Sequence, residues 1–383
     1  MLPSQRHLFS LPPDRHYLNA AATSPLLASA EAAAAEGLRQ QRDPSAIPPD
    51  DFFEQPDRVR GLFARLVRTQ AERVALVPAV SYANAVLAKN LTLEAGQEVV
   101  MLGAQFPSHV YPWRELAARA GVRTVSVEAP GPLGMEGRGA RWNERLLEAI
   151  TPRTGLVAVP QIHWSDGTVF DLEAVGARAR EVGAAFVVDG TQSVGAMPFD
   201  WTRVRPDALA CAGYKWLLGP HSMGVLVVGD RFRDGRPLEE TWVAREGSRE
   251  FSGLTSYVET YEPGASRFDV GERSNGVLLP WLAAGLEQVL AWTPEAIQAR
   301  CRALAERIGE GARAKGYGVG DRQAGHLFGL RAPDGLAPED IRQRLAAAGV
   351  IVSVRAGVLR VSPHVYNTEA DADALVAALP PAP

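Results

Sequence analysis

Lys215 is the residue whose type and setting most favour covalent chemistry in this sequence. It lies in a short segment with Gly213 before it and Gly219 after it, and the apolar run Val225–Val228 follows. An amine in such a turn can be held away from water, which favours the neutral, nucleophilic form of a lysine. Lys215 is therefore a candidate for Schiff-base formation, although a lone lysine in a turn is more often a solvated surface group.

A carboxylate and an amide that suit the same chemistry stand upstream of this lysine. Asp189 and Gln192 follow the apolar residues Phe186–Val188, which predict a buried strand. Open α/β sheets bind ligands at the carboxyl ends of their strands, so both side chains are expected at a binding cleft. An amine for an aldehyde and a carboxylate for a pyridinium nitrogen are what pyridoxal phosphate (PLP) requires of a protein.

The elements that would position these residues have the pattern of an α/β protein. Short apolar runs bounded by turn residues predict strands, and apolar residues at helical spacing predict helices. The expected strands are Val74–Pro78, Glu98–Leu102, Leu156–Pro160, Phe186–Asp189, Asp207–Ala210 and Val225–Val228. The expected helices begin near Leu27 and near Glu369, and cover Arg58–Arg68, much of Val277–Gly316, and Pro338–Ala348. The segment Glu239–Pro263 follows neither period and is expected to be a loop at the active site.

These motifs, in this order, resemble the class V family of fold-type I PLP-dependent enzymes. That family includes cysteine desulfurases, selenocysteine lyases, kynureninases, some aminotransferases and isopenicillin N epimerase-like proteins. The resemblance runs from about Tyr17 to about Leu379 and implies an α/β, fold-type I PLP-dependent transferase with two domains. The large PLP-binding domain, expected over residues 15–276, would hold a mostly parallel seven-stranded sheet between helices. Residues 277–383, together with 1–14, would form a smaller α/β C-terminal domain.

The resemblance also implies which residues contact the ring of the cofactor, pyridoxal 5'-phosphate. Asp189 would pair with the pyridine nitrogen, and Gln192 would hydrogen-bond the phenolic oxygen. Phe106 would stack on the ring, in the position where desulfurases have a histidine. A phenyl ring can stack but supplies no proton, so this substitution weakens a desulfurase assignment.

The phosphate of the cofactor is expected at the start of the helix that follows Pro78. Free backbone N–H groups at a helix N-terminus bind phosphate, and the family places Ser81 and the backbone near Tyr82 there. From the residues alone, Ser81 fits a simple N-cap equally well. Tyr214 would donate one more hydrogen bond to the phosphate. Gly271 and the four residues after it would reach the cofactor of the partner in a homodimer.

An arginine near the end of the chain is the expected anchor for the substrate. Arg360 lies in Gly357–Glu369, which carries the Arg-x-Ser-x-x-x-Tyr-Asn-Thr pattern of the family. A guanidinium binds a carboxylate through two parallel hydrogen bonds, so Arg360 is expected to hold the carboxylate of an amino acid. His163 and Asp166 are further candidates for substrate recognition. Trp164 stands where relatives have an asparagine, so the hydrogen bond that this asparagine would give to the phenolic oxygen of the cofactor or to the substrate is missing.

The overall composition limits the partners and the compartment. The chain has 383 residues, a formal net charge of -4 and 46% hydrophobic residues, which predicts a globular protein without a basic face for nucleic acid. Two cysteines, Cys211 and Cys301, suggest neither a disulfide framework nor a metal site, so a reducing cytoplasm is expected. No targeting peptide or membrane span is recognisable in the sequence.

The first functional hypothesis is an aminotransferase-like enzyme that acts on a small α-amino acid, with Lys215 moving the proton at Cα. The alternatives are a β-lyase acting on selenocysteine or cysteine conjugates, or an amino-acid epimerase. A catalytically inactive relative with a binding role is a third possibility. Desulfurases carry a mobile cysteine just before the carboxylate arginine, and Val350–Gly357 contains no cysteine.

Overall fold

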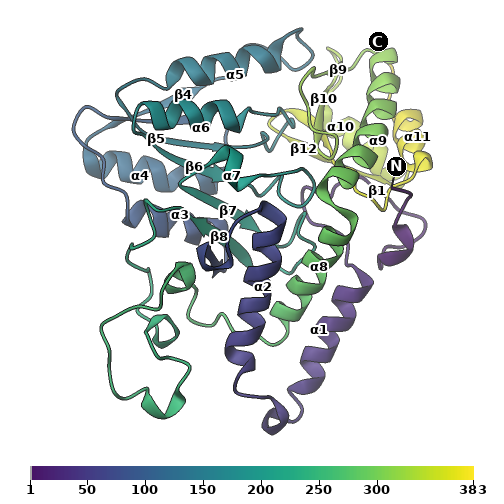
Figure 1. Cartoon of the computed structure of the whole chain (residues 1–383). Helices are drawn as coiled ribbons and strands as arrows, with labels where there is room; N and C mark the ends of the chain where they lie inside the picture. Colours follow the sequence, from purple (N-terminus) through teal and green to yellow (C-terminus); the bar gives the residue numbers. More distant parts are fainter. Residues whose placement is uncertain (1) are drawn as a thin grey trace.

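A seven-stranded sheet forms the centre of the larger part of the chain (Figure 1). The computed structural model describes residues 2–383. Every neighbouring pair in the sheet is parallel except those made by β8, which runs antiparallel to β2 and β7. This confirms the predicted α/β, fold-type I architecture. In spatial order the strands are β2 (Val74–Val77), β8 (Gly224–Val228), β7 (Ala208–Ala212), β6 (Ala185–Asp189), β5 (Thr154–Pro160), β3 (Glu98–Leu102) and β4 (Arg123–Val127).

The sheet is covered on both faces, which explains why its strands are apolar throughout. Alternate residues of one strand enter different cores: Val74 and Leu76 pack on one side, and Ala75 and Val77 on the other. The second side is covered by α3 (Val80–Lys89) and α4 (Tyr111–Ala120). The first side is covered by α1 (Ala28–Gln40), α2 (Asp51–Val67), α5 (Arg138–Ala149), α6 (Leu172–Glu181), α7 (Trp201–Val204) and α8 (Leu278–Trp292).

Several elements depart from the sequence expectations. Helix α2 was expected to begin at Arg58 but begins at Asp51, because Asp51 and Glu54 favour the first turn and Phe53 packs into the buried interior. The edge strand β4 was not predicted, because most of its residues are exposed and give no apolar run. The long helical pattern from Val277 divides at Thr293, whose positive φ of 68° separates α8 from α9 (Pro294–Ala314).

The C-terminal part of the chain forms a second, smaller sheet with its own core. Its strands lie in the order β12 (Ser353–Arg355), β13 (Val358–Val361), β10 (Phe328–Arg331) and β9 (Gly318–Val319). The core beside this sheet is filled from the second half of α9, from α10 (Pro338–Ala347) and from α11 (Glu369–Ala378). The smaller α/β unit predicted from the sequence is therefore present.

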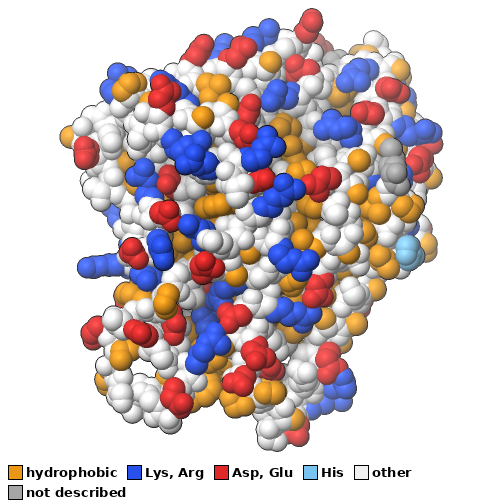
Figure 2. Space-filling view, viewed as in Figure 1, with side chains coloured by type: hydrophobic (Ala, Val, Ile, Leu, Met, Phe, Trp, Pro, Cys, Tyr) orange, Lys and Arg blue, Asp and Glu red, His pale blue; other side chains and the backbone are white. Residues whose placement is uncertain are grey.

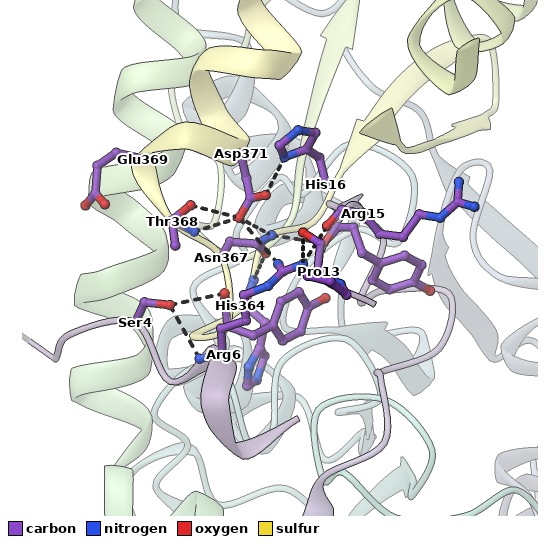
Figure 3. A network of polar contacts seen from close by, with 12 residues as sticks. Ser4, Arg6, Pro13, Arg15, His16, His364, Asn367, Thr368, Glu369 and Asp371 are labelled. Carbon is purple, nitrogen blue, oxygen red and sulfur yellow. Dashed lines mark hydrogen bonds and ion pairs between the residues drawn. The ribbon is translucent and has the colours of Figure 1, made fainter. Parts of the chain in front are cut away.

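The N-terminal segment is tied to this smaller unit by hydrogen bonds. Strand β1 (His16–Tyr17) pairs in parallel with β11 (Val350–Ile351). The Ser4 hydroxyl donates to the Tyr366 carbonyl (3.2 Å). His16 Nδ1 lies 2.6 Å from Asp371 Oδ1, and Figure 3 shows these two side chains facing each other. The grouping of residues 1–14 with the C-terminal domain stays a prediction, because Phe9 packs in the core of the large sheet and residue 1 lies outside the described residues.

The boundary expected at residue 277 stays a prediction, and the packing favours a later position. Helix α8 contributes Leu279, Leu282 and Leu286 to the core of the large sheet. Helix α9 contributes Ile297 to that core and Ile308 to the core of the smaller unit. Because one helix belongs to both cores, it is the natural connection between the two units.

The face of the molecule seen in Figure 2 carries both acidic and basic side chains. Figure 2 shows red and blue side chains interspersed over the visible face, with no broad region of one sign. The segment Glu239–Pro263 extends from the body as an irregular loop (Figure 1), with only short 3-10 turns at Trp242–Ala244 and Phe251–Gly253. Among residues 2–383, none of the helices is both long enough and apolar enough to cross a bilayer.

Candidate active site

A cavity of about 370 Å³ opens at the carboxyl ends of the central strands. Parallel α/β sheets bind ligands at this edge, where side chains from separate strand ends converge. The structure brings together here six of the residues that the sequence analysis singled out for the cofactor: Ser81, Phe106, Asp189, Gln192, Tyr214 and Lys215.

Lys215 is presented by the connection between the antiparallel strands β7 and β8. The connection folds back closely: a Cβ at Gly213 would lie 2.6 Å from the Met223 carbonyl oxygen, so only glycine fits there. The hydroxyl of Ser24 donates to the Lys215 carbonyl (2.6 Å) and ties the turn to the N-terminal segment. The backbone of the lysine is thus fixed on both sides.

The amine of Lys215 lies in a poorly solvated position. The residue is 6% exposed, and its Nζ lies 5.6 Å from the ring centre of Phe106 and 5.3 Å from that of Tyr214. Burial, helped by the positive charge of Arg360, lowers the pKa of Lys215 to about 8 against the opposing effect of Asp189. A substantial fraction of the amine is therefore neutral and nucleophilic near neutral pH.

Asp189 ends strand β6 and lies on the cavity wall. Its Oδ1 accepts a hydrogen bond from the backbone N–H of Thr191 (2.9 Å). Its other carboxylate oxygen accepts no hydrogen bond from residues 2–383. One oxygen thus orients the carboxylate, and the other is available to a positively charged ring nitrogen.

Gln192 is held rigidly by two partners. Its Nε2 donates to the Ala21 carbonyl (3.1 Å), and its Oε1 accepts from the indole of Trp216 (2.9 Å). An amide nitrogen carries two hydrogens, so one N–H of Gln192 is left for a ligand in the cavity. The position of this donor was predicted from the sequence, but the Trp216 indole that orients it was not.

The start of α3 forms another wall of the cavity. The N-cap residue is Ala79, which offers no side-chain oxygen, and Ser81 lies exposed in the first turn. Ser81 is therefore not the N-cap, and the first amides of the helix remain free to bind an anion. Two polar residues that the sequence analysis missed, His221 and Ser222, also line the cavity. The ring of His221 stacks on Tyr214 with centroids 3.9 Å apart. The position of His221 directly after Gly219-Pro220, in the turn that carries Lys215, was the feature of the sequence that could have identified it.

The rings of Phe106 and Trp164 meet at one side of the cavity. Their centroids lie 5.4 Å apart in an edge-to-face arrangement, and the Trp164 indole donates to the Ala104 carbonyl (2.7 Å). Phe106 remains 38% exposed, so its face can still contact a flat ligand. The indole occupies the place where an asparagine was expected to make a hydrogen bond.

Arg360 does not line the cavity directly, but its guanidinium carbon lies 6.0 Å from the ring centre of Trp164, which does. Its Nη1 donates to the Trp164 carbonyl (3.0 Å), and its Nε donates to the Ser353 hydroxyl (3.3 Å). Within residues 2–383 it has no carboxylate at ion-pair distance. Burial, with the charge of Arg355, lowers the pKa of Arg360 to about 10. A buried guanidinium without an acidic partner is a strong site for an incoming carboxylate.

His163 and Asp166 lie outside the cavity, in a buried polar cluster. Asp166 forms an ion pair with Arg138 (2.9 Å) and accepts from the Thr168 backbone N–H (2.9 Å). His163 contacts the Ser165 hydroxyl (2.9 Å) and the Gly103 carbonyl (3.1 Å), and burial lowers its pKa. Since their polar atoms are already engaged, the expected role in substrate recognition has no support from the geometry.

Tyr82 and Gly271 also do not line the cavity, and both lie near Glu239. The Gly271 N–H donates to a Glu239 carboxylate oxygen (2.7 Å). Burial and the charge of Glu239 raise the pKa of Tyr82. Because the Tyr82 side chain does not line the cavity, only the backbone at this position remains a candidate for phosphate binding.

The chemistry of the cavity fits PLP. The neutral amine of Lys215 suits the aldehyde, the free carboxylate oxygen of Asp189 suits the pyridinium nitrogen, and the start of α3 suits the phosphate. Each requirement is met by a different element, at a different wall of one cavity.

Comparison with known proteins agrees with this fit to PLP. The family model described as aminotransferase class-V matches residues 16–375. The chain is 27% identical over 320 residues to an uncharacterised aminotransferase, YcbU, of Bacillus subtilis, covering 83% of this chain and 81% of the relative. It is 28% identical over 338 residues to the isopenicillin N epimerase of Streptomyces clavuligerus, covering 84% and 83%.

Solved structures with low sequence identity share the fold. The cystine C–S lyase C-DES, in complex with its product cysteine persulfide, superposes with a TM-score of 0.84 at 20% identity, covering 95% of this chain and 97% of that one. An apo cysteine desulfurase from Thermococcus onnurineus gives a TM-score of 0.79 at 20% identity, covering 97% and 95%.

Proposed function

Since this chain belongs to the class V aminotransferase family of PLP-dependent enzymes, we propose that Lys215 binds PLP and that the enzyme removes the amino group of a small α-amino acid by transamination. The observation that carries the proposal is the buried Lys215 amine, whose pKa is lowered to about 8, on one wall of a cavity with Asp189. A structural protein has no need to bury this amine beside unpaired polar groups.

Lys215 is the proposed acid and base. When bound, PLP supplies an aldehyde for amines and a ring that accepts the electrons released at Cα. An amine with a pKa near the working pH can both take a proton from Cα and return one. Asp189 would keep the ring nitrogen positively charged, and the remaining N–H of Gln192 would donate to the phenolic oxygen. Phe106 would exclude water from one face of the ring.

Arg360 is the proposed anchor of the substrate carboxylate. It is 2% exposed and lacks an acidic partner within residues 2–383, while its contacts with Ser353 and the Trp164 carbonyl fix its plane. Trp164 lines the cavity and lies next to Arg360, so movement of the indole would let a carboxylate in the cavity reach the guanidinium. The volume of about 370 Å³, shared with the cofactor, supports a small substrate.

Transfer of sulfur to a cysteine of this chain is disfavoured by the positions of its thiols. Cys211 and Cys301 are 1% and 0% exposed, and burial raises the pKa of Cys301 to about 12 and that of Cys211 well above its usual value. The residues before Arg360 form a tight turn at Ala356-Gly357 between β12 and β13, without a mobile cysteine. This supports transamination over a desulfurase reaction.

The deciding experiment compares products across a panel of amino acids. The purified PLP-loaded enzyme is incubated with each amino acid with and without a keto-acid acceptor, and the keto acid, pyruvate, sulfide and the enantiomer of the amino acid are measured. We expect acceptor-dependent formation of the cognate keto acid, abolished in Lys215→Ala. Pyruvate with sulfide and no need for an acceptor would identify a β-lyase, and loss of optical purity alone would identify an epimerase. Absence of every product would favour a binding role.

A homodimer is also proposed. The loop Glu239–Pro263 exposes large apolar side chains, with Trp242 38%, Phe251 41% and Tyr257 87% exposed. The neighbouring Gly271 is fixed by Glu239 at the base of this loop. Exposed aromatic residues on an extended loop are typical of a protein interface, which supports contact with a second copy.

A further inference from the structure

A second arginine, Arg355, lies on the same face of the small sheet as Arg360. In the antiparallel pair β12–β13, Ser353 is directly opposite Arg360, and Arg355 is opposite Val358. Residues two apart on a strand point to the same face, so Arg355 and Arg360 are diagonal neighbours. Diagonal neighbours in such a pair lie roughly 7–8 Å apart. The hydrogen bond from Arg360 Nε to the Ser353 hydroxyl (3.3 Å) confirms that the side chains of Ser353 and Arg360 lie on the same face of the sheet.

Arg355 has no acidic partner that would explain its position. It is half-buried, and among residues 2–383 its side chain makes one hydrogen bond, from Nη1 to the carbonyl of the preceding Val354 (2.8 Å). No carboxylate of the described chain lies within ion-pair distance of it. By contrast, Arg331 of the same sheet pairs with Asp334 (2.9 Å).

The charge of Arg355 acts on the active site. It contributes to lowering the pKa of both Arg360 and Lys215, so these three cations are near one another. Like charges held together in a poorly solvated site are unfavourable unless an anion joins them. One substrate carboxylate balances Arg360, and the charge of Arg355 remains.

We propose that Arg355 forms a second anion site, and that the substrate is an amino acid with an acidic side chain. This inference rests on the proposed function, because it takes the α-carboxylate to be bound by Arg360. The spacing of the two arginines suits a short dicarboxylate, with one carboxylate on each guanidinium. Arg355 then determines specificity, and a neutral amino acid leaves it without a partner.

Binding of carboxylates that lack an amine tests the inference without any turnover. Isothermal titration calorimetry of the PLP-loaded enzyme compares butyrate, which has one carboxylate, with succinate and glutarate, which have two. We expect the dicarboxylates to bind at least about tenfold more tightly, or about 1.4 kcal/mol, with the advantage decreasing at high salt. Arg355→Gln should remove this advantage while changing the Kd of butyrate much less than that of the dicarboxylates, and Arg355→Lys should restore part of the advantage.

Arg331→Gln is the matched control, because it makes the same change of charge in the same sheet but at a residue paired with Asp334. It should retain the dicarboxylate advantage. If butyrate binds in a manner that depends on Arg360 and succinate and glutarate bind no better, the second anion site is refuted and the amino-acid enzyme stands. An equal advantage in the wild type and in Arg355→Gln would also refute it. If no carboxylate binds and no amino acid yields a product, the proposed function itself fails.

Discussion

The lowered pKa of Lys215 predicts how fast the apoprotein captures PLP at each pH. With a pKa of about 8 in place of 10.5, about a quarter of the amine is neutral at pH 7.5, against about 0.1% for an ordinary lysine. The neutral amine is the nucleophile, so capture should be about 200-fold faster than by a free lysine side chain at that pH. Below pH 8 the amine becomes protonated and the rate should fall about tenfold per pH unit.

The assay relies on the small number of lysines in the chain. Apoprotein is mixed with PLP between pH 6 and 10, quenched with borohydride at short times, and analysed by peptide mass spectrometry. Three lysines are present, and the other two are engaged elsewhere: Lys89 donates to the Pro237 carbonyl (2.7 Å), and Lys315 to the Leu379 carbonyl (2.6 Å). Their peptides serve as internal controls in every sample, and N-acetyl-lysine amide supplies the reference rate.

The cause of the shift is tested by removing one charge. Arg360→Gln deletes a positive charge that lowers the pKa of Lys215, so the midpoint of the rate profile should move to higher pH. A midpoint above pH 10 in the wild type, or an adduct mainly on Lys89 or Lys315, would refute the assignment of Lys215. An unchanged midpoint in Arg360→Gln would show that burial alone lowers the pKa.

Three further outcomes are expected. Asp189→Ala should lose most turnover even at saturating PLP, because the ring nitrogen loses its charged partner; unchanged kcat would contradict this role. Asp166→Ala should lower the free energy of unfolding by about 3–5 kcal/mol, since it leaves the buried Arg138 unpaired. PLP capture by the folded variant should be unchanged. Loss of capture without loss of stability would show that Asp166 acts in the active site. Light scattering of the active enzyme should give twice the mass of the 41.2 kDa chain, and an active monomer would exclude the dimer.

The sequence by itself determined the architecture and the central residues of the site. Apolar runs buried on both faces give an unambiguous strand signal, so β3, β5, β6 and β8 were expected within about two residues of their observed bounds. Lys215, Asp189 and Gln192 could be expected at one edge of the sheet because each follows such a strand, whereas their roles toward the cofactor came from the resemblance to the class V family. The position of a residue can be predicted from the sequence in this way when it depends on a single local element.

Only the tertiary structure decided which polar residues face the cavity. His163 and Asp166 follow β5 just as Asp189 ends β6. They nevertheless lie outside the cavity, because Arg138 of helix α5 pairs with Asp166. The relation of Arg355 to Arg360 required the register of β12 with β13, and the indole that orients Gln192 comes from the turn beyond Lys215. These contacts join residues of different elements, and no local pattern of residue types encodes which partner a buried charge will find.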